Sequence, residues 1–197
     1  MKRLKTAYEI ALERAKSLDG DLSKEEKSLF LREKLKPLLA DFYRSKIGPE
    51  DLWQELKKEE DQDLCREAQL MLLRSMGLQT TAEDLQRRKE GILAVESLLG
   101  GEKSSLIEQV IEEIREVQEN YRSRLEDYRK FYEKALKNAG MKMKPVRTRD
   151  GQVVMQLQRE LDGLTEERLE KSLQELEKQS SQKISDLVKE LEETLVS

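Results

Sequence analysis

The long run from Ser104 to Ala139 contains neither glycine nor proline, and this constrains the fold more than any other feature of the sequence. Its apolar residues recur at heptad spacing, with Gln118 as the one polar member of the stripe. An unbroken run with one apolar stripe of this period predicts a single helix of about 35 residues, about 50 Å long. The apolar members are Ile107, Ile111, Ile114, Tyr121, Leu125, Tyr128, Tyr132 and Ala135.

The first hundred residues predict short helices instead, because signals that start and stop helices follow one another closely there. Gly48 ends one helix, and Pro49 suits the first position of the next. Pro37 interrupts an earlier apolar stretch, so we expect a kink or break near Lys36. The predicted short helices cover residues 4–18, 23–48, 49–58, 62–76 and 81–99.

The segment after Asp150 fits two interpretations. Asp150-Gly151 would suit the turn of a β-hairpin, whereas Val154, Leu157 and Leu161 recur at helical spacing. We favour a helix that begins at Asp150 and continues to the end of the chain, with the β-hairpin over residues 144–156 as the alternative. On the helical interpretation, residues 140–150 form the connecting loop.

Together these elements predict an all-α fold with two domains. Residues 1–101 form a small bundle of short helices, and residues 102–197 form a long, coiled-coil-like helical hairpin whose connecting loop lies near 140–150. The two long helices are expected to run antiparallel, because a short connection must bring their apolar stripes together.

Composition excludes several classes of function. The chain has no histidine and one cysteine, so catalytic triads, histidine-ligated metals and cysteine-ligated zinc are excluded, and we expect no cofactor. The N-terminus lacks the apolar core of a signal peptide, and no apolar run reaches the length of about 18 residues that a transmembrane helix requires. We therefore expect a cytoplasmic protein without a transmembrane segment.

Adjacent carboxylates and the single cysteine are the remaining candidates for catalysis. Pairs such as Glu112-Glu113 and Glu166-Glu167 diverge by about 100° on a helix and stand among basic residues, which is typical of solvated faces. Cys65 lies on the apolar side of its helix, where a small buried group needs no chemical role. We predict that the protein is not an enzyme, with a carboxylate-based or metal-assisted enzyme as the remote alternative.

A stripe of tyrosines marks a candidate partner-binding surface. Tyr121, Tyr128 and Tyr132 occupy heptad positions of the long helix, where packing in the seam is the simplest interpretation. Tyrosine is also well suited to protein interfaces, so a binding face for a protein partner is the alternative.

Four basic residues form the candidate anion-binding site: Lys142, Lys144, Arg147 and Arg149. The segment Met141–Arg149 has no acidic residue, so it could hold phosphate or an acidic protein surface. No aromatic residue interleaves with these cations for base stacking, so a nucleic-acid function is an alternative that we do not favour. Arg87-Arg88-Lys89 is a second, smaller basic cluster.

Three segments resemble a known family: LKTAYEIALERAKSLDGD at the start, DLCREAQLMLLRSMGL in the middle, and DGQVVMQLQRELDGL after the long charged helix. The chain is similar to a family of uncharacterised bacterial proteins known only as a domain of unknown function. The resemblance implies that the segment from Asp150 to Leu164 begins as a helix. It implies no activity, ligand or functional residue.

The sequence therefore predicts a non-enzymatic protein-interaction or scaffold protein that acts through its long helical hairpin. Its expected partner is another protein or a second copy of itself, because helices with narrow apolar stripes commonly complete their burial by association. A nucleic-acid or ribosome-associated factor that docks through the basic loop is the alternative.

Overall fold

The computed structural model describes residues 24–147, 150–159, 161 and 163–196. The helix predicted over residues 4–18 lies outside the described residues. The chain forms two compact units, each described here by itself. Unit 1 comprises Met1–Ser75 and Arg87–Ser104, and unit 2 comprises Met76–Gln86 and Ser105–Ser197. The division into folding domains at residue 101 stays a prediction.

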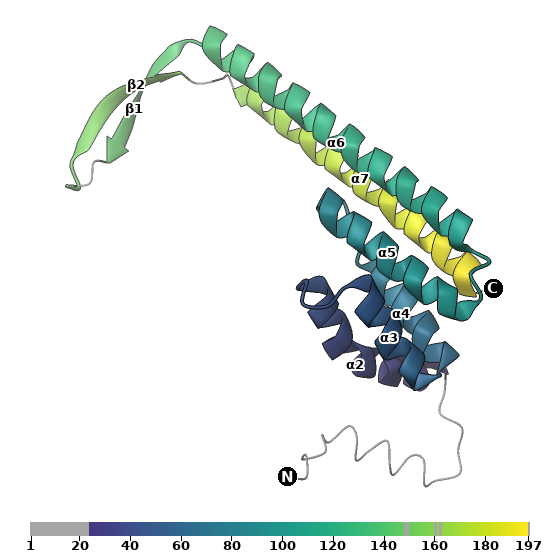
Figure 1. The fold of residues 1–197 in the computed structure, drawn as a ribbon. Coiled ribbons are helices and arrows are strands. Elements are labelled where there is room, and N and C mark those ends of the chain that lie inside the picture. Colours follow the sequence, from purple (N-terminus) through teal and green to yellow (C-terminus); the bar gives the residue numbers. More distant parts are fainter. Residues whose placement is uncertain (1–23, 148–149, 160, 162, 197) are drawn as a thin grey trace. The chain divides into compact units, whose positions relative to one another are not determined.

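Unit 1 is a group of short helices around α4. Its described elements are α2 (Lys24–Tyr43), α3 (Pro49–Glu59), α4 (Gln62–Arg74) and the part of α5 (Ala82–Leu99) that follows Gln86 (Figure 1). Helix α4 lies at the centre and is buried on most of its circumference. Its buried residues are Leu64, Cys65, Glu67, Ala68, Gln69, Leu70, Leu72 and Leu73.

Helix starts agree closely with the sequence signals. Pro49 is the first residue of α3, and the Asp51 carboxylate accepts a hydrogen bond from the Gly48 N–H at 2.8 Å. At the start of α4, the Asp61 carboxylate accepts from the Leu64 N–H at 3.1 Å. Such caps satisfy backbone donors that have no partner inside a helix, and both helices begin where the sequence analysis expected them.

A kink or break was predicted near Lys36, and the helix does not break there. Helix α2 continues through Pro37 to Tyr43, because Leu35 and Leu39 on either side of the proline are buried and hold the helix against the core. The helix also ends before Gly48, since the chain turns at Ser45, which has a positive φ of 61°. Packing thus outweighs the local cost of a helical proline.

Two buried carboxylates fasten the helices of unit 1 to one another. Glu67 pairs with Arg32 at 2.5 Å and accepts a hydrogen bond from Ser28, so it joins α4 to α2. Glu96 accepts from the Gln69 side-chain amide at 2.8 Å and from the Lys103 N–H at 3.0 Å. Each carboxylate is buried but hydrogen-bonded, which is the condition under which a buried charge is tolerated.

Unit 2 contains the two long helices. Helix α6 (Ser104–Asn138) and helix α7 (Gly163–Val196) run antiparallel and side by side, which confirms the predicted helical hairpin (Figure 1). The near-perfect agreement at α6 follows from its lack of any breaker between the first and last turn. The predicted fold, short helices followed by a long helical hairpin, is confirmed in its mostly helical character.

The connection between the long helices corrects the sequence analysis. Strands β1 (Met141–Arg147) and β2 (Val153–Arg159) form an antiparallel ribbon, so the helix predicted from Asp150 is wrong and α7 begins only at Gly163. Gly151, in the connection between the strands, has a positive φ of 79°, a conformation that glycine adopts without steric cost. The connecting loop expected near 140–150 is therefore mostly β-structure. The helical start that the family resemblance implied for the segment from Asp150 to Leu164 is also wrong.

Gly91 in α5 provides a test of the packing in unit 1. A Cβ atom on Gly91 would lie 2.8 Å from the Phe42 Cζ atom, and Phe42 is fully buried. Gly91→Ala should lower the free energy of unfolding by about 1–2 kcal/mol, because overpacking outweighs the gain in helix propensity. Chemical denaturation followed by Trp53 fluorescence measures this, since Trp53 lies in unit 1 and is the one tryptophan of the chain.

The control is the double variant that also carries Phe42→Leu, which removes the atom in the way. In a double-mutant cycle the cost of Gly91→Ala should then shrink. A Gly91→Ala chain that is more stable than the wild type would show that α2 and α5 do not approach this closely.

Candidate protein-binding groove on the helical hairpin

Burial of the α6 stripe changes along the helix. From Ile107 to Gln118 the apolar side is buried, whereas Leu125 and Tyr128 are half-buried and Tyr132 is 40% exposed. The buried members are Ile107, Val110, Ile111, Ile114, Val117 and Gln118. The half of α6 that leads into the ribbon therefore keeps part of its apolar stripe accessible.

A third segment of unit 2 covers α6 at the place where burial ends. The Gln118 side-chain amide donates to the Gly77 carbonyl at 2.7 Å, and the Arg122 guanidinium donates to the Thr80 carbonyl at 3.2 Å. These two residues are one helical turn apart, so together they fix the loop at residues 77–80 against α6. Leu125 and Tyr128, one and two turns further on, have α7 as their neighbour.

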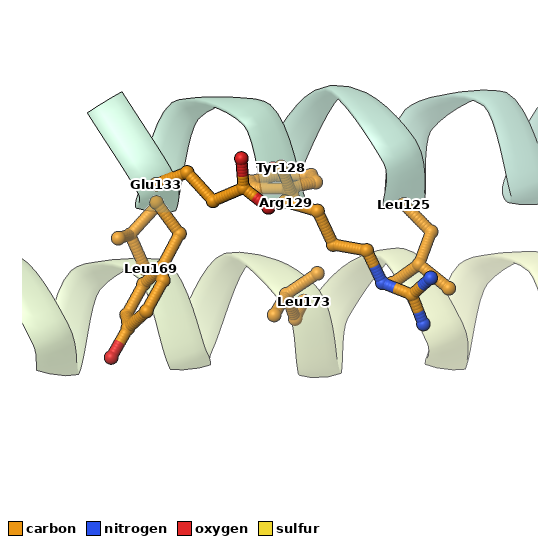
Figure 2. Close-up of a pocket in the computed structure, with 7 residues that line it drawn as sticks. Leu125, Tyr128, Arg129, Glu133, Leu169 and Leu173 are labelled. Carbon is orange, nitrogen blue, oxygen red and sulfur yellow. The ribbon is translucent and has the colours of Figure 1, made fainter. Parts of the chain in front are cut away.

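An apolar groove of about 250 Å³ lies along α6 and α7 beyond this covered region. Figure 2 shows Leu125, Tyr128 and Leu173 between the two helices, with the Arg129 and Glu133 side chains beside them. We call this surface the Tyr132 groove. Its lining consists of Leu125, Tyr128, Arg129, Tyr132, Glu133, Leu169 and Leu173.

A second hollow lies on the other side of the same seam, and we call it the Phe131 groove. Arg124, Asp127 and Phe131 line it, together with Tyr128 and Leu169. Phe131 is 56% exposed, a large value for so apolar a side chain. Because Tyr128 and Leu169 line both grooves, they form the wall between them, and the two-helix seam is open on both sides.

Charged residues line the grooves, with Arg129 and Glu133 at one and Arg124 and Asp127 at the other. On the far side of α6, Lys130 pairs with Glu126 at 3.0 Å, and hydrogen bonding to that carboxylate raises the pKa of Lys130. On α7, Lys171 pairs with Glu167 at 2.6 Å. The grooves thus combine an apolar floor with a charged rim, which is the anatomy of a protein interface.

The structure brings two of the three predicted tyrosines into one site. Tyr128 and Tyr132 both line the Tyr132 groove, whereas Tyr121 is half-buried nearer the covered region. The sequence analysis missed Phe131, although an aromatic residue outside the heptad stripe and among charges was a signal of an exposed apolar group.

The four predicted anion-binding residues do not lie in one loop. Lys142 and Lys144 fall in β1, opposite Gln158 and Gln156, and their side chains lie outside the described part of the structure. Arg147 is exposed at the end of β1, and Arg149 lies outside the described residues. Because successive strand positions alternate, position 147 falls on the opposite face of the ribbon from positions 142 and 144.

The second basic cluster has a structural role. The Arg87 guanidinium donates to the Ile47 carbonyl at 3.0 Å, and the Arg88 guanidinium donates to the Ser75 carbonyl at 2.8 Å. Each guanidinium also stacks on an aromatic ring, that of Phe42 for Arg87 and that of Tyr43 for Arg88. These arginines hold the turns after α2 and α4 in place, so they contribute to the fold of unit 1.

The adjacent carboxylates take part in pairs along the helices. Glu112 pairs with Arg115, Glu113 accepts a hydrogen bond from Gln109, and Glu59 pairs with Lys34. Within the described residues, no group of three or more acidic or cysteine side chains is placed to hold a metal ion. None of the described helices combines the length and apolar content that a membrane-spanning helix needs.

The architecture defines a mostly helical protein with a long helical hairpin. The two-stranded ribbon connects the two long helices of this hairpin in the sequence. A family of unknown function, DUF6657, matches residues 50–193, and the chain belongs to this family. No curated protein and no solved structure matches the chain. The matched region includes α3 to α7, apart from Pro49 and the last residues of α7, and therefore both grooves.

Cys65, the other candidate from the sequence, is buried in unit 1 at 5% exposure. Burial raises the pKa of its thiol, and the nearby Asp61 carboxylate raises it further. Native protein should therefore react with an aromatic disulfide reagent at pH 8 slower than unfolded protein by a factor of about 100 or more. Absorbance of the released thiolate measures the rate, and rapid stoichiometric reaction of the native chain would show Cys65 to be an accessible nucleophile.

Proposed function

We propose that this chain is a cytoplasmic, non-enzymatic interaction protein that binds an amphipathic helix of a partner protein in the Tyr132 groove. The observation that carries the proposal is the accessible strip of aromatic and leucine side chains where no other described segment of unit 2 covers the α6–α7 seam. An amphipathic helix fits such a groove with apolar residues at i, i+3 or i+4, and i+7.

The side chains of the groove suit recognition of a helix. Tyr128 and Tyr132 offer large apolar area at a low cost in conformational entropy, and each carries a hydroxyl group for a hydrogen bond at the rim. Leu169 and Leu173, one turn apart on α7, line the opposite side. A partner side chain that enters between these walls loses contact with water on most sides, which is where binding energy concentrates.

The rim supports an orientation for the partner helix. Arg129 and Glu133 lie one turn apart along the same edge of the groove and carry opposite charges. A partner helix with an acidic residue near Arg129 and a basic residue near Glu133 would gain complementarity in one direction and lose it in the other. Such rim charges contribute more to specificity and to the rate of association than to affinity.

Tyr132→Glu tests the groove directly. It places a charge on the apolar floor, so the affinity for the partner should fall by a factor of about 10 to 100, as for a central interface residue. Ser123→Glu is the matched control, because it adds the same charge to an exposed position on the far side of α6. The measurement is affinity capture from the native cell at mild salt, with quantitative mass spectrometry of each variant.

The proposal requires a partner that the wild type and Ser123→Glu both retain and that Tyr132→Glu loses. A photo-crosslinking residue at position 132 should then attach to an amphipathic helix of that partner. Equal retention by both variants would contradict the groove as the binding surface. Loss of every partner on nuclease treatment would instead support docking of the basic residues on nucleic acid.

A further inference from the structure

The ribbon β1–β2 has only two strands and exposes an apolar face. Its residues are exposed on the face that carries Met141, Met143, Val153 and Met155, at 59%, 58%, 62% and 56% respectively. A two-stranded hairpin with an uncovered apolar face is only marginally stable in water, whereas three or more strands with such a face are stable. Additional strands at one edge of the ribbon would therefore stabilise it.

The register shows which backbone groups point away from the ribbon. Pro145 pairs with Met155 and has no N–H, so this pair cannot exchange hydrogen bonds between the strands. Pair types alternate along an antiparallel ribbon, so positions 141, 143, 145 and 147 point outward from β1. Positions 153, 155, 157 and 159 point outward from β2 in the same way.

The two open edges therefore differ. The outward edge of β1 lacks a donor at Pro145, a common way in which proteins block an edge strand. The outward edge of β2 keeps its N–H and C=O groups at all four positions. Only β2 offers an uninterrupted edge for a new strand.

Charge decides what kind of strand fits this edge. Val153 to Gln158 contains no charged residue, so two copies of β2 can pair antiparallel without repulsion. The register with Gln156 opposite Gln156 of a second copy uses every outward position and places Met155 opposite Leu157 and Val153 opposite Arg159. Two copies of β1 would instead place Lys144 opposite Lys144 and would lack two hydrogen bonds at Pro145.

We propose that two copies of this chain associate through antiparallel pairing of their β2 strands, which forms a four-stranded sheet in the order β1-β2-β2-β1. The pairing is isologous and closes after two copies, because each β1 edge carries the proline. The inference is independent of the helix-binding function, because the strand residues and the groove residues are separate sets.

Leu157→Pro tests the pairing with the full-length chain. The N–H of Leu157 points outward, so proline there removes a donor of the β2 edge and leaves the hydrogen bonds between β1 and β2 intact. Met143→Pro is the matched control, since Met143 is the cross-strand partner of Leu157 and its N–H points outward from the other edge. Both variants place proline in the same cross-strand pair, Met143 and Leu157. They differ only in which outer edge of the ribbon loses an N–H donor.

Sedimentation equilibrium between about 1 and 100 µM measures association of the wild type and both variants. We expect a dimer for the wild type and Met143→Pro, and a dissociation constant at least about tenfold higher for Leu157→Pro. A wild type that stays monomeric throughout, or a dimer that both proline variants weaken equally, overturns the proposal. A dimer that Tyr132→Glu disrupts but Leu157→Pro does not overturns it as well, and assigns self-association to the helical groove.

A disulfide cross-link checks the register. Gln156 faces its copy as a pair without mutual hydrogen bonds, with Cα atoms about 4.5 Å apart, within the range that a disulfide spans. Gln156→Cys should form a covalent dimer with oxidised glutathione, whereas the wild type, whose one cysteine is the buried Cys65, should not. Adding Leu157→Pro to Gln156→Cys should abolish the cross-link, and its persistence would contradict pairing through β2.

Discussion

The long helix α6 carries an apolar stripe along most of its length, and the rest of unit 2 depends on how much of that stripe is buried. A single antiparallel neighbour such as α7 covers one side of the stripe and leaves a groove on each flank. Near Gln118 and Arg122 the loop at residues 77–80 supplies a third layer, held by two hydrogen bonds to backbone carbonyls. Beyond that point no other described segment of unit 2 covers the seam, and the grooves are the direct consequence.

Gln118 shows how a polar residue can be retained in an apolar seam. Within the described structure, its Oε1 atom is buried without a hydrogen-bond partner, which costs free energy that a leucine would not. Its amide nevertheless satisfies the Gly77 carbonyl and thereby fixes one position of the loop along α6. A polar group that costs stability but specifies register is a known device of coiled coils, and here it specifies where the third layer ends.

Most of the helical fold was predictable, because caps and breakers are local signals. Pro49, Asp61 and the breaker-free run of α6 act through their own neighbours, so the sequence places these helices almost to the residue. The ribbon was not predictable from such signals. Val154, Leu157 and Leu161 fit the period of a helix, whereas Val153, Met155 and Leu157 fit the period of a strand. In so short a segment both periods fit, so periodicity alone does not choose between helix and strand.

The candidate site was predictable only in part. The heptad identified Tyr128 and Tyr132 as stripe residues, but whether stripe residues are buried depends on contacts with residues about 40 positions earlier in the chain. The hydrogen bond between Gln118 and Gly77 is such a contact, and no sequence pattern near either residue predicts it. Phe131 lies outside the stripe, so its exposure follows from helix geometry once the seam is known.

The groove exposes apolar side chains, whereas the β2 edge exposes backbone hydrogen-bonding groups. The two surfaces therefore recognise different features of a partner. A groove selects side chains, because its apolar floor and the charges of Arg129 and Glu133 discriminate among helices. A strand edge recognises backbone, so it favours any uncharged extended segment, and a second β2 is such a segment. Dimerisation through β2 would leave the groove residues free and double their number in one particle. A partner that displays two suitable helices could then occupy both grooves of one dimer. Once its first helix is bound, the second helix binds at a high effective concentration, which raises the avidity without any new contact.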